Sequence, residues 1–302
     1  MLAGTSCALV YGGTMITVYG EALVDLVPQD PSPLAPLVPA LGGGPFNVAR
    51  ALGRLGADVS FQSRLSRDNF GEALAQSLLH AHVDLTNCGR GDEPTTLAVT
   101  ALAENGSATY TFYVDGTADR FAQPVPVQEG YAVFGTLSLA LEPASLRYAE
   151  AASQSAKHGA IVCLDPNIRP AFASEKHRLF LRGLLDSVTV LKLSDEEVEF
   201  LGDTSHVPVV VTTLGADGLR VCAPFGTVTV PSPKVTVADT IGAGDTVMAA
   251  LVHQFDARGL DRNALLALGE EEWREILSFA TRAAAITVSR TGADTPFAHE
   301  LD

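Results

Sequence analysis

Residues 239–246 read Asp239-Thr240-Ile241-Gly242-Ala243-Gly244-Asp245-Thr246, and an apolar run, 247–252, follows at once. Because neither Gly nor Pro occurs again until Gly259, the pattern predicts a helix that begins near Ala243. Gly242 and Gly244 allow backbone N–H groups to converge on one point at the start of that helix. Such a helix N-terminus binds anions. The stretch therefore predicts a phosphate site built from Gly242, Ala243 and Gly244.

Asp245 lies inside this predicted anion site, where a carboxylate repels a bound phosphate. An acid in that place suits a general base that takes a proton from a hydroxyl about to attack the phosphate. The simpler alternative is a Gly-rich loop whose Asp only stabilises the first helical turn.

The composition indicates a large globular α/β protein. The chain has 302 residues, of which 47% are hydrophobic and 18% charged, and this excludes extensive disorder. The formal net charge of −15 disfavours nucleic acids and anionic membranes as partners, and no apolar run approaches the ~20 residues of a membrane span. The four Cys are far apart, which fits a reducing cytoplasm better than disulfides or zinc: Cys7, Cys88, Cys163 and Cys222.

The order of elements predicts a doubly wound, mostly parallel sheet of the Rossmann type. Residues 16–20, continued by 21–25, form the first expected strand, and near-continuous apolar runs mark further strands at 132–134, 160–164, 188–191 and 209–211. Helical patterns lie between them, at 45–55, 70–81, 143–157, 174–185 and 195–200. Ligands of such sheets bind at the carboxyl ends of the strands.

Two other segments have a different character. Residues 95–114 alternate apolar with polar side chains around the turn 104–106, which predicts an antiparallel hairpin with one face exposed to water or a ligand. Five prolines between Pro28 and Pro39 exclude a central strand, so that piece belongs at the surface or at a sheet edge. Residues 1–14 are weakly patterned and precede the first strand. We expect them to be an extension or cloning remnant before a single domain of residues 15–302.

Two motifs resemble the signatures of one known family. Residues 239–245 resemble the C-terminal signature of the ribokinase/fructokinase (PfkB-type) sugar kinases, and residues 42–57, beginning Gly42-Gly43-Gly44-Pro45-Phe46-Asn47, resemble the N-terminal one. The resemblance implies a Rossmann-like core with a β-lid formed by about 22–44 and 92–118. It also implies ATP and Mg²⁺ as cofactors, with K⁺ a further candidate near Asp239 and Ile241, and a homodimer through the lid.

On the sugar side, the resemblance implies that Asp25, Gly43 and Asn47 bind hydroxyl groups. A carboxylate suits a polyol because it accepts from two hydroxyls and brings no competing donor. The alternatives are a turn residue for Asp25 and a helix cap for Asn47.

Three loops after predicted strands complete the expected site. In Asp165-Pro166-Asn167-Ile168-Arg169-Pro170, the resemblance implies that Asn167 meets the substrate and that Arg169 meets the substrate or the transferring phosphate. In residues 192–197 it implies that Lys192 contacts the nucleotide and that Glu197 orders Mg²⁺-bound water. A capping box between Ser194 and Glu197 explains the same spacing without metal. In residues 213–218 it implies a nucleotide loop: Thr213, Gly215 and Gly218, together with Gly244.

The sequence therefore predicts ATP-dependent phosphorylation of a sugar primary hydroxyl, with fructose favoured because residues 112–119 resemble a fructokinase lid strand. The alternatives are another substrate of the same family, such as ketodeoxygluconate, ribose, a nucleoside or a sugar phosphate, and a non-catalytic sugar- or nucleotide-binding protein. Val114 stands where ketodeoxygluconate kinases use an Arg, and Ser138 where ribokinases carry a Glu. A P-loop kinase is excluded because the chain has no Walker-type lysine loop.

Overall fold

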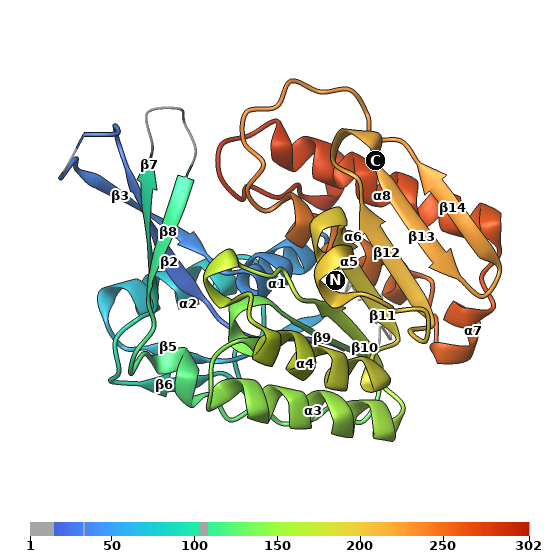
Figure 1. Cartoon of the computed structure of the whole chain (residues 1–302), viewed down its shortest axis with the longest axis horizontal. Helices are drawn as coiled ribbons and strands as arrows, with labels where there is room; N and C mark the ends of the chain where they lie inside the picture. The colour runs from blue at the N-terminus through green and yellow to red at the C-terminus, as the bar shows by residue number, and fades with distance from the viewer. Residues whose placement is uncertain (1–14, 33, 103–107, 302) are drawn as a thin grey trace, which may run out of the picture.

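The computed structural model describes residues 15–32, 34–102 and 108–301, which form a large twisted sheet between two layers of helices and a smaller sheet beside it (Figure 1). The large sheet has eight strands in the order β14-β13-β12-β11-β10-β9-β1-β4. Their bounds are β1 (Ile16–Tyr19), β4 (Val59–Gln62), β9 (Tyr131–Gly135), β10 (Ile161–Asp165), β11 (Val190–Ser194), β12 (Val209–Thr213), β13 (Leu219–Ala223) and β14 (Gly226–Val230). The predicted α/β fold class is confirmed.

The helices cover the two faces of this sheet. Two separate clusters of buried apolar residues lie on the two faces. One face packs against α1 (Gly44–Arg54), α2 (Asn69–His80), α6 (Ala243–Ala257), α7 (Arg262–Leu266) and α8 (Glu270–Val288). The other packs against α3 (Ala144–His158), α4 (Glu175–Leu184) and α5 (Asp195–Leu201).

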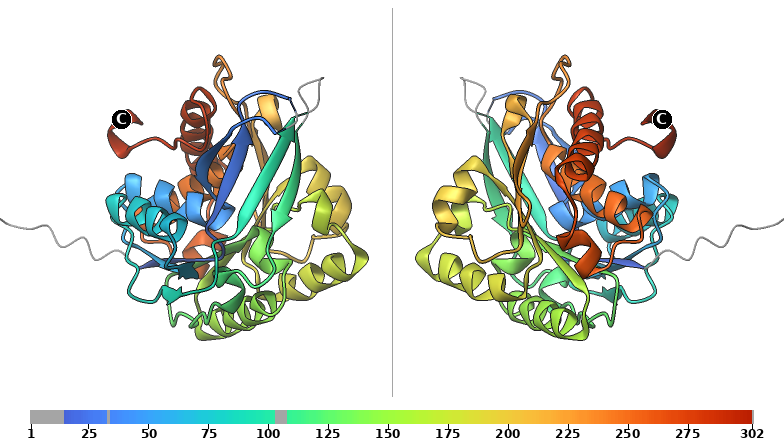
Figure 2. Two further views of the ribbon diagram at one scale, coloured as in Figure 1. Left: turned by 90° about the vertical axis from the view of Figure 1, so that its left-hand side faces the viewer. Right: turned by 90° about the vertical axis from the view of Figure 1, so that its right-hand side faces the viewer.

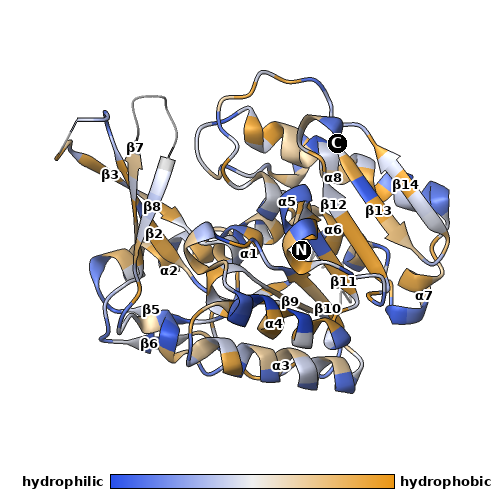
Figure 3. Ribbon diagram, in the orientation of Figure 1, coloured by the Kyte–Doolittle hydropathy of each residue, from blue (hydrophilic) through white to orange (hydrophobic). Residues whose placement is uncertain are grey.

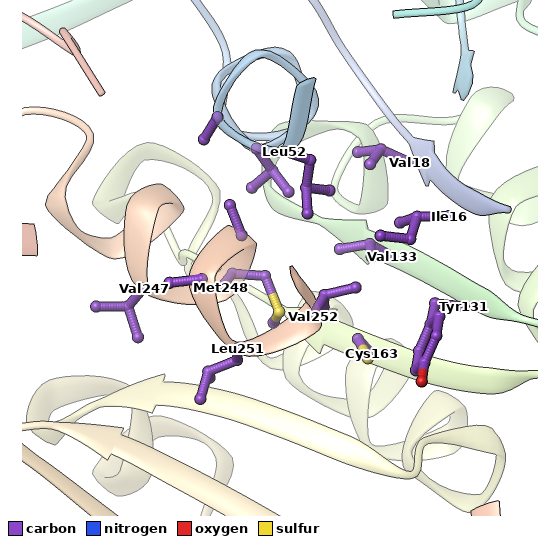
Figure 4. Packing of buried hydrophobic residues seen from close by; sticks show 14 of the residues in the cluster. Ile16, Val18, Leu52, Tyr131, Val133, Cys163, Val247, Met248, Leu251 and Val252 are labelled. Atoms are coloured by element: carbon purple, nitrogen blue, oxygen red, sulfur yellow. The ribbon is translucent and has the colours of Figure 1, made fainter. Parts of the chain in front are cut away.

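The core gathers where α6 crosses the sheet. Met248, Leu251 and Val252 of α6 point toward apolar side chains of the central strands, and Leu52 of α1 lies on the same side (Figure 4). All four side chains are fully buried. The apolar run after Asp245 therefore packs the start of α6 against the sheet. Figure 3 shows the hydrophobic colour of β12, one of the strands of that sheet.

The sheet is parallel from β12 to β4, as the apolar runs predict, and antiparallel at its other end. β13 pairs antiparallel with both β12 and β14. These two strands were not predicted. Buried and exposed residues alternate in β13, so the segment lacks the continuous apolar run that marks a strand covered on both faces.

The smaller sheet stands over one end of the large one, and we call it the lid (Figure 2). Its order is β3-β2-β7-β8, with β2 (Leu23–Pro28), β3 (Leu37–Gly42), β7 (Leu97–Leu102) and β8 (Ala108–Tyr113). These strands fall within 22–44 and 92–118, the segments expected to form a lid. The β7–β8 hairpin is antiparallel as predicted, and its predicted turn, 104–106, lies outside the described residues, as does the expected extension, 1–14.

One expectation about the lid is wrong. Residues 21–25 do not continue the first strand, because β1 ends at Tyr19 and β2 begins at Leu23 in the other sheet. Gly20, with φ of 143°, allows the change of direction between them. The Pro-rich segment agrees with the expectation only in part. Pro39 lies in β3, the edge strand of the lid, but Pro28 is the last residue of β2, an inner strand, just beyond the residues that pair with β7.

Hydrogen bonds anchor the base of the lid. The hydroxyls of Thr96 and Thr117 donate to the buried Asp119 carboxylate at 2.6 and 2.8 Å. The backbone N–H of Thr95 donates to Asp68 Oδ2 at 2.8 Å, where Asp68 caps α2. A two-stranded sheet, β5 (Arg64–Ser66) with β6 (Gly89–Gly91), lies nearby. In the described part of the chain, no helix combines the length and apolar character needed to cross a bilayer.

Candidate functional site

A cavity of about 660 Å³ lies at the carboxyl ends of the parallel strands, beside the lid. Its lining includes twelve residues that the sequence analysis singled out: Asp25, Gly43, Asn47, Asn167, Arg169, Lys192, Glu197, Thr213, Ile241, Gly242, Gly244 and Asp245. This is the place where a doubly wound sheet binds its ligands.

The start of α6 faces this cavity. Gly242 is the residue before the helix and has left-handed backbone angles, φ 77° and ψ 0°. A Cβ at Gly242 would lie 2.7 Å from the Cβ of Ala293, so only glycine fits here. Helix α6 then begins at Ala243, as predicted. Its first N–H groups lack partners within the helix, and this end of the helix therefore favours an anion.

Asp245 is buried in the first turn of α6 and contacts a residue from the other signature motif. Asn47 Nδ2 donates to Asp245 Oδ2 at 2.8 Å. Burial raises the pKa of the Asp245 carboxyl, against the opposing effects of the Asn47 hydrogen bond and the charges of Lys192 and Arg169. The alternative that Asn47 caps a helix is wrong, because Gly43 is the residue that precedes α1. Asn47 Oδ1 is buried and has no hydrogen-bond partner among the described residues, which suits a hydroxyl donor from a ligand.

A buried ion pair lies beside the start of α6. Lys192 Nζ donates to Asp165 Oδ2 at 2.7 Å, and the two side chains are 5% and 4% exposed. A Cβ at Gly244 would lie 2.8 Å from Lys192 Nζ, so the ammonium lies against the first turn of α6. Burial raises the pKa of Asp165 to about 7 against the attraction of Lys192. Burial alone would lower the pKa of Lys192, but Asp165, Glu197 and Asp245 reverse that effect, so Lys192 stays charged.

Glu197 serves as a structural acceptor on both carboxylate oxygens. Its Oε2 accepts the backbone N–H of Ser194 at 2.7 Å, which completes a capping box on α5. Its Oε1 accepts the backbone N–H of Ile168 at 2.6 Å and so ties α5 to the loop that carries Arg169. The capping box that the sequence offered as the alternative is therefore present, and Glu197 lines the cavity as well.

The lid side of the cavity carries Asp25 and several lid residues. Burial raises the pKa of Asp25 to about 6, and the charge of Arg169 partly opposes this shift. The side chain of Arg169 is exposed, and no carboxylate of the described residues lies within ion-pairing distance of it. Asn167, with φ of 41°, is held in a left-handed conformation in the same loop. Apolar and hydroxyl groups of the lid complete this wall: Leu23, Val27, Thr100, Tyr110 and Phe112.

Four predicted site residues do not line the cavity: Gly215, Gly218, Asp239 and Ala243. Asp239 instead accepts two backbone N–H groups, from Ile241 at 3.0 Å and from Gly292 at 2.9 Å. Gly215 and Gly218 have positive φ values of 56° and 100° and form a turn beyond β12.

Sequence reasoning gave no role to Glu21 and Asp165, two buried acids at this edge of the sheet. Glu21 accepts the backbone N–H and the hydroxyl of Ser138 at 2.9 and 2.7 Å, and also the hydroxyl of Thr136. Burial raises its pKa against these hydrogen bonds. The position of each acid directly after an apolar strand was the available signal, because a strand end in this fold faces the ligand.

Comparison with known proteins gives one consistent result. A sequence model described as pfkB family carbohydrate kinase matches residues 13–300. A fructokinase of Rhizobium leguminosarum bv. trifolii is 35% identical over 258 residues, which is 79% of this chain and 78% of that protein. A fructokinase of Xylella fastidiosa, solved with bound ATP, superposes with a TM-score of 0.85 at 26% identity, over 95% of this chain and 96% of that one. A fructokinase of Vibrio cholerae O395, solved with fructose, ADP and a potassium ion, gives 0.80 at 26% identity, over 95% and 97%.

The buried ion pair makes a testable prediction about stability. Lys192→Met would leave the Asp165 carboxyl buried without its cation, and we expect a loss of about 3–5 kcal/mol in the free energy of unfolding. The loss should be smaller at pH 5 than at pH 8, because the orphaned carboxyl has a raised pKa and takes up a proton at the lower pH.

The matched control is the double variant Lys192→Met with Asp165→Asn, which removes both charges. Urea unfolding should show a smaller loss for the double variant than for the single one. Equal losses at both pH values would mean that the ion pair is not what stabilises this part of the sheet.

Proposed function

The chain belongs to the pfkB family of carbohydrate kinases, and from that premise we propose that it transfers the γ-phosphoryl group of ATP to the primary hydroxyl of fructose. The observation that carries the proposal is the position of Asp245, a buried carboxylate at a helix start suited to anions and in contact with the sugar-side motif through Asn47.

Asp245 acts as the general base in this proposal. Its raised pKa brings its proton affinity closer to neutral pH, where a base that accepts a hydroxyl proton works best. As the proton moves to Asp245, the sugar oxygen forms a bond to the γ-phosphorus, and the bond from that phosphorus to the leaving oxygen of ADP breaks. The N–H groups of Gly242, Ala243, Gly244 and Asp245 stabilise the charge on the transferring group.

Two cationic side chains bind the phosphate groups in this proposal. Lys192, held by Asp165 beside Gly244, meets the nucleotide phosphates, and Arg169, which has no protein partner among the described carboxylates, meets the transferring group or the sugar. Local cations of this kind are needed because the net charge of −15 repels anionic ligands. The nucleotide also contacts the loop beyond β12 in this proposal, at Thr213, Gly215 and Gly218.

Magnesium would accompany the nucleotide. No cluster of three or more acidic, His or Cys side chains able to hold a metal occurs within residues 15–32, 34–102 and 108–301. That fits Mg²⁺, which keeps several waters and binds substrate phosphates with few protein ligands. Glu197 would order one of those waters. The ion would neutralise charge on the phosphates. We also propose a K⁺ ion beside Asp239 and Ile241, supported by the potassium-bound Vibrio fructokinase.

Asn167, Asn47, Gly43 and Asp25 bind the sugar hydroxyls in this proposal. Val114 stands where ketodeoxygluconate kinases carry an Arg, and Asp25 places an acid on this side of the cavity beside Arg169, which disfavours ketodeoxygluconate as the substrate. The runner-up is a kinase for another neutral sugar or nucleoside of the same family.

We further propose a homodimer through the lid, which exposes apolar side chains at Leu34, Leu37, Val38 and Tyr113. Sedimentation that finds only monomer at micromolar concentration would contradict it. The free cysteines Cys88, Cys163 and Cys222 support a reducing, cytoplasmic location, which cell fractionation can test.

A coupled assay of ADP release tests the substrate. The panel holds fructose, other hexoses, ribose, a nucleoside and ketodeoxygluconate, each measured in K⁺ buffer and in a buffer of a bulky organic cation. We expect the highest kcat/KM with fructose and a loss of turnover without K⁺. A clearly better substrate would reject fructose, and equal rates in the two buffers would reject the K⁺ site.

Asp245→Asn separates a kinase from a binding protein. The change preserves size and polarity but removes the proton acceptor, so kcat should fall by about two to four decades. Nucleotide should bind equally well or more tightly, because one negative charge beside the phosphates is gone. The raised pKa of Asp245 means that the folded state favours the neutral acid. At pH values above the ordinary pKa of an aspartate, the Tm of the Asn variant should therefore equal or exceed that of the wild type.

Kinetics and calorimetric nucleotide binding give the two readouts for this variant. Near-normal turnover would reject Asp245 as the base. A wild-type protein that binds ATP and sugar but releases no ADP would favour the non-catalytic alternative.

Arg169→Ala should lower kcat more than it raises the KM for the sugar. A charge-assisted contact that grows in the transition state is worth roughly 2–4 kcal/mol, or about two to three decades in rate. Arg178→Ala is the matched control, because Arg178 pairs with Glu175 on the outer surface of α4. An unchanged kcat with a raised KM would show that Arg169 only holds the sugar.

A further inference from the structure

The anion loop, residues 239–245, is supported from outside the cavity by the segment that follows α8. We call residues 290–296 the strap. Ala293 packs against Gly242 so closely that a Cβ on the glycine would lie 2.7 Å from the Cβ of Ala293. The backbone N–H of Gly292 donates to Asp239 Oδ2 at 2.9 Å, and Asp239 Oδ1 in turn accepts the N–H of Ile241 at 3.0 Å. A shift of the strap would therefore move the loop.

The strap is held in turn by one arginine of α1. Arg54 donates to Asp294 Oδ1 at 2.7 Å and to the backbone carbonyl of Thr295 at 2.5 Å. Its guanidinium also lies 4.7 Å from the ring centre of Phe297, and its side chain is only 16% exposed. A planar guanidinium with several donors can make all of these contacts at once, which a lysine cannot.

The same helix contacts the other end of the anion loop directly. Asn47 and Arg54 are seven residues apart, which is about two helical turns, so they lie on one face of α1. Asn47 holds Asp245, and Arg54 holds the strap that backs Gly242 and Asp239. The contacts form a closed circuit from α1 through the strap and the loop back to α1.

We propose that Arg54 is a positioning residue for phosphoryl transfer, which acts through the strap to hold the anion loop in register with Asp245 and the sugar. The inference rests on the proposed kinase function. Arg54 does not line the cavity and touches no reacting group, so its effect must pass through Asp294, Thr295 and the loop.

A misplaced loop should slow the chemical step more than it weakens sugar binding. Two of the four residues proposed to bind the sugar, Asp25 and Asn167, lie on the lid and on the loop after β10, away from this circuit. Asn47 belongs to the circuit, but its contact with Asp245 comes from the N-terminal end of α1 and does not involve Arg54. Displacing catalytic groups by about 1 Å costs as much as a hundredfold in rate. For Arg54→Gln we therefore expect kcat to fall by about tenfold to a hundredfold, with the KM for the sugar changed by less than about threefold.

The matched control is Arg50→Gln, which removes the same charge one turn earlier on α1. Arg50 lies over the ring of Phe46 at 5.3 Å and is close enough to feel the charge of Asp294, but within the described residues no hydrogen bond joins it to the strap. The control therefore removes a nearby charge without removing the contacts that hold the strap. Its kcat should stay within about twofold of the wild type. Arg54→Lys should recover part of the lost rate, because an ammonium can still reach Asp294.

Asp294→Asn tests the route. Asp294 also pairs with Arg290, at 3.6 Å, so the comparison is made within the Asp294→Asn background. If Arg54 acts through the Asp294 carboxylate, Arg54→Gln should slow Asp294→Asn much less than it slows the wild type. If the two substitutions lower kcat independently, so that their effects multiply, Arg54 does not act through Asp294 and the inference is overturned.

Amide hydrogen exchange gives a readout that needs no activity. In Arg54→Gln, exchange should rise in residues 240–246 and 290–296 and stay unchanged elsewhere, and Arg50→Gln should match the wild type. Unchanged exchange together with wild-type kcat in Arg54→Gln would overturn the proposal. A wild-type protein without kinase activity would reject the proposed function instead, and exchange would still decide whether Arg54 holds the loop.

Discussion

The hydrogen bond from Asn47 to Asp245 joins two segments that are 198 residues apart, and the rest of the site depends on it. It brings the N-terminus of α1 to the N-terminus of α6, so that a cavity lined by both motifs can exist between them. The bond also has an electrostatic role, because it is the strongest favourable contact of a carboxylate that burial would otherwise drive to its neutral form. A general base must be available as the carboxylate, so in the proposed mechanism Asn47 both positions Asp245 and favours its charged form.

The same balance of burial and charge extends along the sheet edge. Asp165, Glu197 and Asp245 surround one buried cation, Lys192. Three acids and one base leave an excess of negative charge in a region with little water. Glu197 and Asp245 both raise the pKa of Asp165, against the attraction of Lys192. A further cation beside this cluster would relieve the excess of negative charge.

The sequence was sufficient for the fold class and for most strands and helices of the parallel part of the sheet, and it singled out glycine-rich and polar loops that do line the cavity. Buried strands appear as apolar runs, and the turn before α6 needs glycine at Gly242 whatever surrounds it. Contacts between distant segments could not be predicted from the sequence. The pairing of Lys192 with Asp165 depends on two neighbouring strands in parallel register, and the double use of Glu197 depends on where Ile168 lies. The break between β1 and β2 was missed because both strands are apolar and Gly20 is the only glycine that marks the turn between them.

The lid contributes to the cavity without contributing to the phosphate chemistry. Its side chains there, among them Thr100, Tyr110 and Phe112, come from strands that are anchored at one base through Asp119 and Asp68. The anion loop, its strap and the buried ion pair all belong to the larger sheet and its helices. Substitutions in the lid strands can therefore alter which acceptor is admitted while the transfer machinery stays intact. The architecture thus places the lid's share of the cavity wall on strands that carry none of the anion loop, so the shape of that wall can change while the loop and the ion pair stay as they are.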